Sequence, residues 1–225
     1  MNADLFLSDA FRNALDDYFY LLNNHYPQKG ALKLVGDRYR LSTDQRTILY
    51  RGISSREKAT ERKSKITAEP SDSLAIDGYN VIFTLLNYRL GRFVFISNDG
   101  ICRDAGSLFG KIRKDSLFNE CAMILIEFLS NYLNTSITIY FDSPVLSSKK
   151  HRSLLLQLTD DTNINIDVSL VQSADQSLLN DPSSVLASSD SVIIDNAMRP
   201  VLDIPKIIIE GKYGYSLIDL GSLLR

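Results

Sequence analysis

The stretch Ser71-Asp-Ser-Leu-Ala-Ile-Asp-Gly-Tyr-Asn-Val-Ile82 decides the fold of this chain. Within it, a short apolar run at residues 74–76 meets Asp77, and this order predicts a buried strand that ends in a carboxylate. Open parallel sheets bind their ligands beyond the carboxyl ends of their strands. We therefore expect Asp77 to point into a functional site.

The residues that follow Asp77 favour a sharp exit from the strand. Gly78 permits a positive φ at the turn, and Asn80 places a side-chain amide beside the acid. The alternative interpretation is that Asp77 only caps the helix that begins near Tyr79. Asn80 has a functional interpretation, in which its side chain orients Asp77 or contacts a phosphate. The alternative is that Asn80 only stabilises the turn.

Further acids follow three later strand-like runs. They are Asp142 after residues 137–141, Asp175 after residues 168–171, and Asp190 after residues 185–188. Four carboxylates at one edge of a sheet repel one another unless a hard cation neutralises them. Mg²⁺ and Mn²⁺ prefer oxygen ligands, so the pattern predicts a site for one of these ions.

Three of these segments resemble the acidic motifs of a known superfamily. Ile76-Asp-Gly-Tyr-Asn-Val81, Ser173-Ala-Asp-Gln176 and Ala187-Ser-Ser-Asp-Ser191 are similar to the first, third and fourth motifs of PIN-like domains, especially the NYN branch. The resemblance covers residues 71–225. It implies an α/β fold, with a parallel sheet sandwiched by helices, and metal-dependent nuclease activity.

The resemblance also implies roles for individual acids. Asp77, Asp175 and Asp190 are the expected catalytic metal ligands, and Asp142 is a further candidate ligand from its position after a strand. The PIN pattern has one more acid after the first strand, for which this sequence offers both Asp104 and Glu120. The whole chain is also similar to an uncharacterised conserved family that pairs a basic helical N-terminal region with a PIN-like domain.

Composition and length are those of a globular protein with an appended region. The chain has 225 residues, of which 44% are hydrophobic and 23% are charged. No signal pattern opens the sequence, and the longest apolar stretch, residues 121–126, is far too short to span a bilayer. Cys102 and Cys121 form no CxxC pair, so we expect a reduced, cytoplasmic protein with no zinc site and no membrane partner.

Charge is unevenly distributed along the chain. Residues 1–66 contain 12 Lys and Arg against 8 Asp and Glu, whereas the rest of the chain has a net charge of −6. A basic region beside an acidic domain suits a nuclease in which one part holds phosphates and the other holds cations. The alternative is a solvated charged face on each part. We predict a basic helical region over residues 1–66 and a PIN-like α/β domain over residues 71–225.

The basic region is expected to contain short helices. Residues 8–24 have helical periodicity with Ser8 or Asp9 as cap, Pro27 and Gly30 break the pattern, and a second helix starts at Ala31. The segment 42–45 fits a capping box that opens a third helix. This region can grip a nucleic-acid backbone as a helix-turn-helix-like unit, or it can pack as a subdomain. The segment 56–65 is either an exposed helical end or a linker.

Beyond residue 77, alternating strands and helices predict a parallel sheet with right-handed crossovers. Besides the runs already named, we expect strands at residues 92–97 and 207–209 and a terminal helix that ends at Leu224. Asp99-Gly100 predicts a turn. A long helix is expected over residues 119–133.

Several polar residues are candidates for substrate binding. Ser147 and Ser148 open a helix after Asp142, where backbone N–H groups can receive a phosphate. The remaining candidates are Asn80, Arg103, Lys149 and Lys150. An ordinary helix cap with solvated lysines is the alternative for the segment 147–150. His151 and His25 lack partners at metal spacing and are expected at the surface or in packing.

Together these observations predict a phosphodiesterase that uses Mg²⁺ or Mn²⁺ and acts on RNA. Because the second acid is undecided, the alternative is a catalytically silent PIN-like module that binds RNA or a protein. A phosphatase for small molecules at the same edge is a third hypothesis. We also expect at least three of the four aspartates to converge on a common cation.

Overall fold

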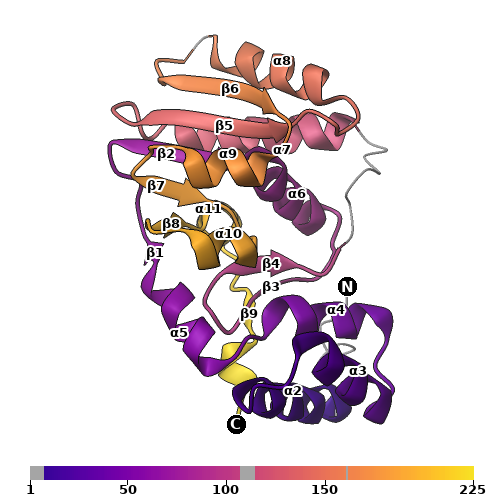
Figure 1. Ribbon diagram of the computed structural model, residues 1–225. Coiled ribbons are helices and arrows are strands. Elements are labelled where there is room, and N and C mark those ends of the chain that lie inside the picture. The colour runs from indigo at the N-terminus through magenta and orange to yellow at the C-terminus, as the bar shows by residue number, and fades with distance from the viewer. Residues whose placement is uncertain (1–7, 107–114, 161) are drawn as a thin grey trace. The chain divides into compact units, whose positions relative to one another are not determined.

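The computed structural model describes residues 8–106, 115–160 and 162–225. Its residues divide into two compact units (Figure 1). The first is drawn from residues 1–64, 87–107 and 215–225, and the second from residues 65–86 and 108–214. The first unit therefore includes two segments that the sequence analysis assigned to the α/β domain.

The second unit is built on a six-stranded parallel sheet with the order β1-β8-β7-β2-β5-β6. Every strand pair within this sheet is parallel. The strands are β1 (Ile66–Thr67), β2 (Ser73–Asp77), β5 (Ser136–Asp142), β6 (Ile166–Val171), β7 (Val185–Ala187) and β8 (Val201–Leu202). The predicted strands that end at Asp77 and Asp142, and those before Asp175 and Asp190, are confirmed.

Helices cover both faces of this sheet, as expected for parallel strands joined by crossovers. They are α6 (Gly78–Arg89), α7 (Asp115–Leu129), α8 (Ser148–Thr159), α9 (Ala174–Asn180), α10 (Ser191–Asn196) and α11 (Ile204–Tyr213). Helices α9 and α10 pack together and lie in front of the strands in Figure 1, while α7 lies behind them and packs on α8. The predicted α/β fold is thus confirmed.

Each face of the sheet has its own apolar layer. Ala75 of β2 packs with side chains of α9, β7 and α10, namely Leu178, Leu186, Ile193 and Ala197. On the other face, the ring of Tyr79 lies 4.5 Å from that of Phe141 and 6.5 Å from that of Phe118, measured between centroids. Because β2 is covered on both sides, residues 74–76 form a continuous apolar run, as parallel sheets require.

The first unit combines helices with a small three-stranded sheet of order β4-β3-β9. Its helices are α2 (Asp9–Asn23), α3 (Gln28–Arg38), α4 (Thr43–Gly52) and α5 (Arg56–Ser64). Its strands are β3 (Val94–Ile96), β4 (Cys102–Asp104) and β9 (Ile218–Asp219), and a 3₁₀ turn, η1 (Gly221–Leu223), follows them. Such short helices need tertiary packing to be stable.

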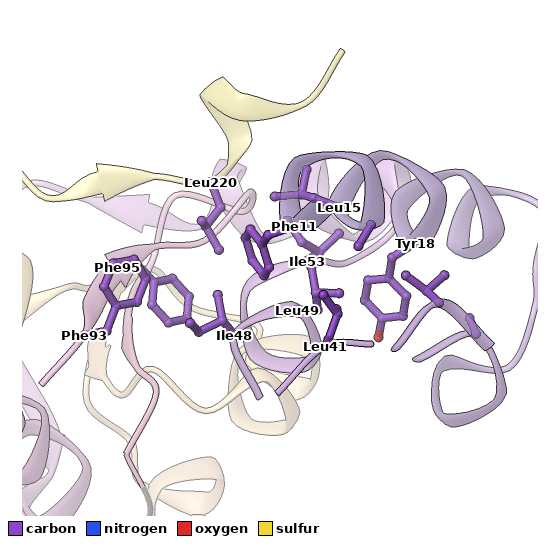
Figure 2. Packing of buried hydrophobic residues seen from close by; sticks show 13 residues of the cluster. Phe11, Leu15, Tyr18, Leu41, Ile48, Leu49, Ile53, Phe93, Phe95 and Leu220 are labelled. Atoms are coloured by element: carbon purple, nitrogen blue, oxygen red, sulfur yellow. The ribbon is translucent and has the colours of Figure 1, made fainter. Parts of the chain in front are cut away.

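One hydrophobic core unites these elements (Figure 2). Phe11, Leu15 and Tyr18 of α2 meet Ile48 and Leu49 of α4, and β3 and the C-terminal segment complete the core with Phe93, Phe95 and Leu220. The helices therefore pack into the core of the first unit, and the predicted nucleic-acid contact stays a prediction. The helix caps at Ser8 and Ser42 are confirmed as well, the second as a complete capping box with Gln45.

Several predicted elements differ in the structure. Residues 207–209 lie in α11 rather than in a strand, because Asp203 caps the helix and Pro205 stands in its first turn. Gly30 lies inside α3, and the break falls at residues 24–27. Residues 94–96 do form a strand, but it pairs antiparallel with β4 through the Asp99-Gly100 turn, outside the parallel sheet.

The end of the basic region and the C-terminal segment of the chain also refine the predictions. Residues 56–64 form helix α5, which settles the choice between helix and linker. The terminal segment contains only the 3₁₀ turn η1 instead of a longer helix. Within the described ranges, no helix is long and apolar enough to cross a membrane.

Candidate functional site: the carboxyl edge of the parallel sheet

The strand order creates a switch point beside β2. The chain moves outward from β2 to β5 and β6, then returns to place β7 on the other side of β2. The segments that leave β2 and β7 therefore diverge to opposite faces of the sheet, which is where open α/β sheets bind ligands. Asp77 ends β2, and Ser188, Ser189 and Asp190 follow β7 at this position.

Hydrogen bonds join the two strand ends. The Oδ1 atom of Asp77 accepts the backbone N–H of Asn80 at 3.1 Å, and its Oδ2 atom accepts the hydroxyl of Ser188 at 3.3 Å. The Oδ1 atom of Asn80 accepts both the backbone N–H and the hydroxyl of Ser189, at 2.8 and 3.0 Å. Asp77 thus caps α6, and it also faces the loop after β7.

Asn80 holds this loop in place, which gives it a positioning role. The substrate contact predicted for Asn80 stays a prediction. Ser188 and Ser189 were missed as site residues by the sequence analysis, although both stand in the motif that identified Asp190. The sequence did contain a signal for them, because two serines directly after a buried strand do not contribute to the apolar core.

Gly78 serves the site through close packing. The sequence analysis expected a positive φ, but Gly78 is not among the residues with positive φ. A Cβ atom at this position would lie 2.4 Å from the Phe141 ring and 2.7 Å from Ile139. The absence of a side chain therefore lets the start of α6 lie directly against β5.

Asp77 is buried, with 6% of its surface exposed. The pKa of Asp77 is raised to about 7, mainly by burial and also by the negative charges of Asp175 and Asp142, while the hydrogen bonds from Asn80 and Ser188 oppose the shift. The electrostatic influence of the two other carboxylates shows that they lie near Asp77. Three of the four predicted acids therefore share one environment.

Asp190 belongs to the same environment. The surrounding protein displaces water from Asp175 and raises its pKa, and the charges of Asp190 and Asp142 add to the effect. The prediction that Asp77, Asp142, Asp175 and Asp190 meet at one edge agrees with these couplings. The stronger prediction, that three of them reach a common cation, is not met as the side chains lie. In the described parts of the chain, no three His, Cys, Asp or Glu side chains are spaced to hold a metal ion.

Local hydrogen bonds explain this spacing. Asp142 Oδ1 accepts the backbone N–H of Ala174 at 2.9 Å, and Asp190 Oδ1 accepts that of Val192 at 2.6 Å. Both acids therefore cap helices that begin at this edge. Asp175 is exposed and, among the described residues, takes part in no hydrogen bond or ion pair. It is the acid that is most free to reorient.

The structure separates the two candidates for the additional acid. Glu120 lies on α7 in the second unit and is half-buried. Asp104 belongs to β4 of the small sheet in the first unit, where it pairs with Arg51 at 3.4 Å and accepts the N–H of Gly106 at 2.8 Å. Asp104 therefore already has partners within the first unit, and its role as a metal ligand stays a prediction.

Arg103 is also placed differently from its prediction. It is only 2% exposed, and its guanidinium pairs with Asp99 at 2.8 Å. Asp99 pairs in turn with Arg62 of α5 at 3.2 Å and accepts the hydroxyl of Ser97. Two arginines around one buried carboxylate form an internal network of the first unit. Arg103 is thus a structural residue and does not present its charge to a substrate.

The segment 147–150 begins α8, as predicted. Ser147 has a left-handed backbone with φ of 68°, and Ser148 is buried with its hydroxyl donated to the carbonyl of Ser143 at 3.0 Å. Lys149 is exposed, and Lys150, also exposed, pairs with Asp115 of α7. Only the lysines and Ser147 therefore remain open to a ligand.

His151 has the packing role that was one of its two predicted alternatives. It is buried, its Nδ1 atom lies 3.0 Å from the hydroxyl oxygen of Tyr79, and its ring stacks on Phe118 at 3.8 Å. Burial lowers its pKa. The contact joins the first turn of α8 to the first turn of α6, and so supports the geometry of the edge.

Comparison with known proteins identifies families for both parts of the chain. Residues 68–207 match the family described as "Domain of unknown function (DUF5616)", and residues 10–65 match "Protein of unknown function (DUF434)". The chain is 30% identical over 188 residues to "Uncharacterized protein MJ0935" of Methanocaldococcus jannaschii. The aligned segment covers 82% of this chain and 89% of the relative. The comparison with solved structures gave no match.

Proposed function

The chain belongs to the DUF5616 family, and we propose from the geometry of its α/β unit that this unit is a PIN-like phosphodiesterase. In this proposal the enzyme uses Mg²⁺ or Mn²⁺ and acts on RNA. The observation that supports this proposal is the group of electrostatically coupled aspartates at the switch point of the sheet. Carboxylates that raise one another's pKa are costly to hold together unless a cation binds.

The oxygen ligands at this edge are of the kind that a hard divalent cation prefers. Asp77, Asp142, Asp175 and Asp190 would hold it, because all four offer oxygen atoms and follow neighbouring strands. When bound, such an ion supplies an activated water and neutralises the charge of the phosphodiester. Asp175 has the freedom to turn toward Asp77, whereas Asp142 and Asp190 each keep one oxygen on a helix N–H and have the other available.

The protein's own residues contribute binding and orientation. Asn80 and Ser189 fix the loop that carries Asp190, and Ser188 orients Asp77. Lys149 lies near the start of α8, which follows Asp142, and provides a positive charge for a phosphate group. In this proposal the basic helices of the first unit hold the RNA strand.

A specific observation favours a second candidate function. The described residues contain no ready group of three metal ligands, and Asp104 is committed to Arg51. Both facts suit a catalytically silent module that binds RNA or a protein partner through the same edge. We also propose a cytoplasmic location, since Cys102 and Cys121 are both buried and neither forms a disulfide.

The test is cleavage of a labelled single-stranded RNA by the purified full chain with Mg²⁺, with Mn²⁺ and with EDTA. We expect metal-dependent cleavage that falls at least about a hundredfold in Asp77→Asn and Asp175→Asn. Asp72→Asn, the same substitution at an exposed residue just before the opposite end of β2, is the control. RNA binding without cleavage under all conditions would favour the silent module, and hydrolysis of nucleotides or sugar phosphates with intact RNA would favour a small-molecule phosphatase.

A further inference from the structure

A pocket in the first unit shares no lining residue with the acidic edge. Its volume is about 250 Å³, and its walls come from the end of α6, the following turn, β3 and the segment before β9. The residues that matter for its chemistry are Tyr88, Gly91, Arg92, Phe93, Tyr215 and Leu217. None of the residues that line it is acidic.

Two tyrosines form an aromatic corner in this pocket. The ring centroids of Tyr88 and Tyr215 are 6.1 Å apart, and the ring planes meet at 53°. Tyr215 is 49% exposed, which leaves much of this large ring open to a partner. A planar ligand can stack on one tyrosine while its edge meets the other, which is the preferred geometry of aromatic groups. Phe93 and Leu217 are buried and extend the apolar wall.

Arg92 supplies a positive charge in the same pocket. Its Nη1 atom donates to the Oδ1 atom of Asn87 at 3.0 Å, and Asn87 is itself 1% exposed. The guanidinium is therefore held by a buried residue, and this one bond uses one of its five N–H donors. Arg92 has no carboxylate partner among the described residues. It can accordingly pair with an anionic ligand.

Gly91 keeps the rim of the pocket open. Its φ is +66°, and no atom lies within 4 Å of the position that a Cβ would take. Its neighbour Arg89 is exposed and adds a second positive charge to this turn. An uncharged apolar ligand would leave the charge of Arg92 without a counter-charge. Aromatic walls with arginine beside them match a flat ring that carries a negative group.

We propose that this pocket binds a single nucleotide, with the base stacked on Tyr215 against Tyr88 and the phosphate on Arg92. The volume lies just below the range of about 300–1,000 Å³ that is typical of ligand pockets, which suits one base better than a dinucleotide. The nucleotide can be free, or it can be part of a single-stranded RNA, because both present the same base and phosphate. The proposal does not depend on cleavage at the sheet edge.

A fluorescent reporter tests this proposal. The chain contains no tryptophan, so Tyr215→Trp introduces the sole one, directly in the proposed stacking position. AMP, adenosine and a hexameric oligoadenylate are titrated into the full-length variant. Stacking should quench the tryptophan saturably, and AMP should bind at least about tenfold more tightly than adenosine because of its charge-assisted hydrogen bonds to Arg92. Tyr20→Trp, on a 66% exposed position of α2, is the matched control and should show no saturable quenching.

A second substitution tests the role of the charge. Arg92→Gln in the Tyr215→Trp background should remove the preference for AMP and leave adenosine binding unchanged, with thermal melts confirming that the variant is folded. Should it fail to fold, the comparison of AMP with adenosine in Tyr215→Trp alone carries the test.

The outcomes also separate the two sources of the nucleotide. Tighter binding of the hexamer than of AMP supports an RNA strand, and equal or weaker binding of the hexamer supports a free nucleotide. Absence of saturable quenching by both, or equal quenching of Tyr20→Trp, overturns the proposal. Equal affinity for AMP and adenosine overturns the assignment of Arg92 to the phosphate.

Discussion

Opposing interactions act on the ionisation of Asp77. Its burial disfavours the ionised form, while hydrogen bonds from Asn80 and Ser188 stabilise it, and burial dominates because the pKa is raised to about 7. The acid therefore destabilises the metal-free protein whenever it is ionised. Such a cost at the carboxyl end of a central strand is typical of functional positions rather than of structural ones.

This balance predicts a pH dependence for the metal-free protein. A carboxyl group with a raised pKa in the folded state contributes stability below its unfolded pKa of about 4, and that stability is lost as the pH rises through 7. A pKa near 7 instead of 3.8 corresponds to roughly 4 kcal/mol. Loss of the Ser188 hydrogen bond in Asp77→Asn offsets about 1 kcal/mol of this.

We therefore expect Asp77→Asn to be more stable than the wild type at pH 8 by a few kcal/mol, and to lose this advantage near pH 4. Urea unfolding of both proteins in EDTA, from pH 4 to pH 8, measures the difference. A constant difference across this range would show that Asp77 does not titrate as described, whatever its role in metal binding.

At the level of the elements, three of the acids also accept a backbone N–H from the first turn of a helix, namely Asp77 from α6, Asp142 from α9 and Asp190 from α10. Asp190 is the N-cap of α10, with its Oδ1 atom 2.6 Å from the backbone nitrogen of Val192. The sequence analysis treated a cap and a metal ligand as alternatives for such residues. The structure shows that one oxygen can cap while the charge still acts on Asp175.

Two substitutions at Asp190 separate these roles. Asparagine caps helices as well as aspartate does, whereas alanine costs about 1 kcal/mol. We expect Asp190→Asn to keep or slightly raise the melting temperature without metal, since it relieves the repulsion with Asp175, and Asp190→Ala to lower it. Both variants should lose most of the stabilisation that Mn²⁺ gives the wild type. If Asp190→Asn gains as much from Mn²⁺ as the wild type does, Asp190 is a cap alone.

Much of the second unit could be predicted from local patterns. Apolar runs that end in Asp77 or Asp142 identify strands because they are covered on both faces, and Ser42 with Gln45 identifies a helix start. Residues 207–209 were wrongly predicted because a run of three isoleucines suits both a strand and a buried helix face. The cap at Asp203 and Pro205 was the signal that could have decided it.

The site was harder to predict than the fold. Strand order placed Asp77, Asp142, Asp175 and Asp190 at one edge, and chain position alone was enough to suggest this. Chain position cannot show that Asp104 pairs with Arg51 or that Asp99 pairs with Arg62, because these partners are distant in sequence. Side-chain hydrogen bonds likewise decide how the acids are spaced.

At the scale of the whole molecule, sequence order does not follow the compact units. The first unit takes residues 87–107 and 215–225 in addition to its N-terminal helices, since Phe93, Phe95 and Leu220 complete its core. The family match at residues 10–65 therefore covers only part of that unit. The aromatic pocket, which lies wholly in those two added segments, belongs to the first unit as well.

The central claim is that the aspartates at the switch point form one cation site, and direct titration of Mn²⁺ tests it most simply. The signal of free Mn²⁺ in electron paramagnetic resonance gives the bound fraction for the wild type and for Asp175→Asn, which removes the one acid of the four without a hydrogen bond among the described residues. We predict saturable binding to the wild type and at least about tenfold weaker binding to the variant. Equal binding to both proteins, or no saturable binding to the wild type, would contradict the account.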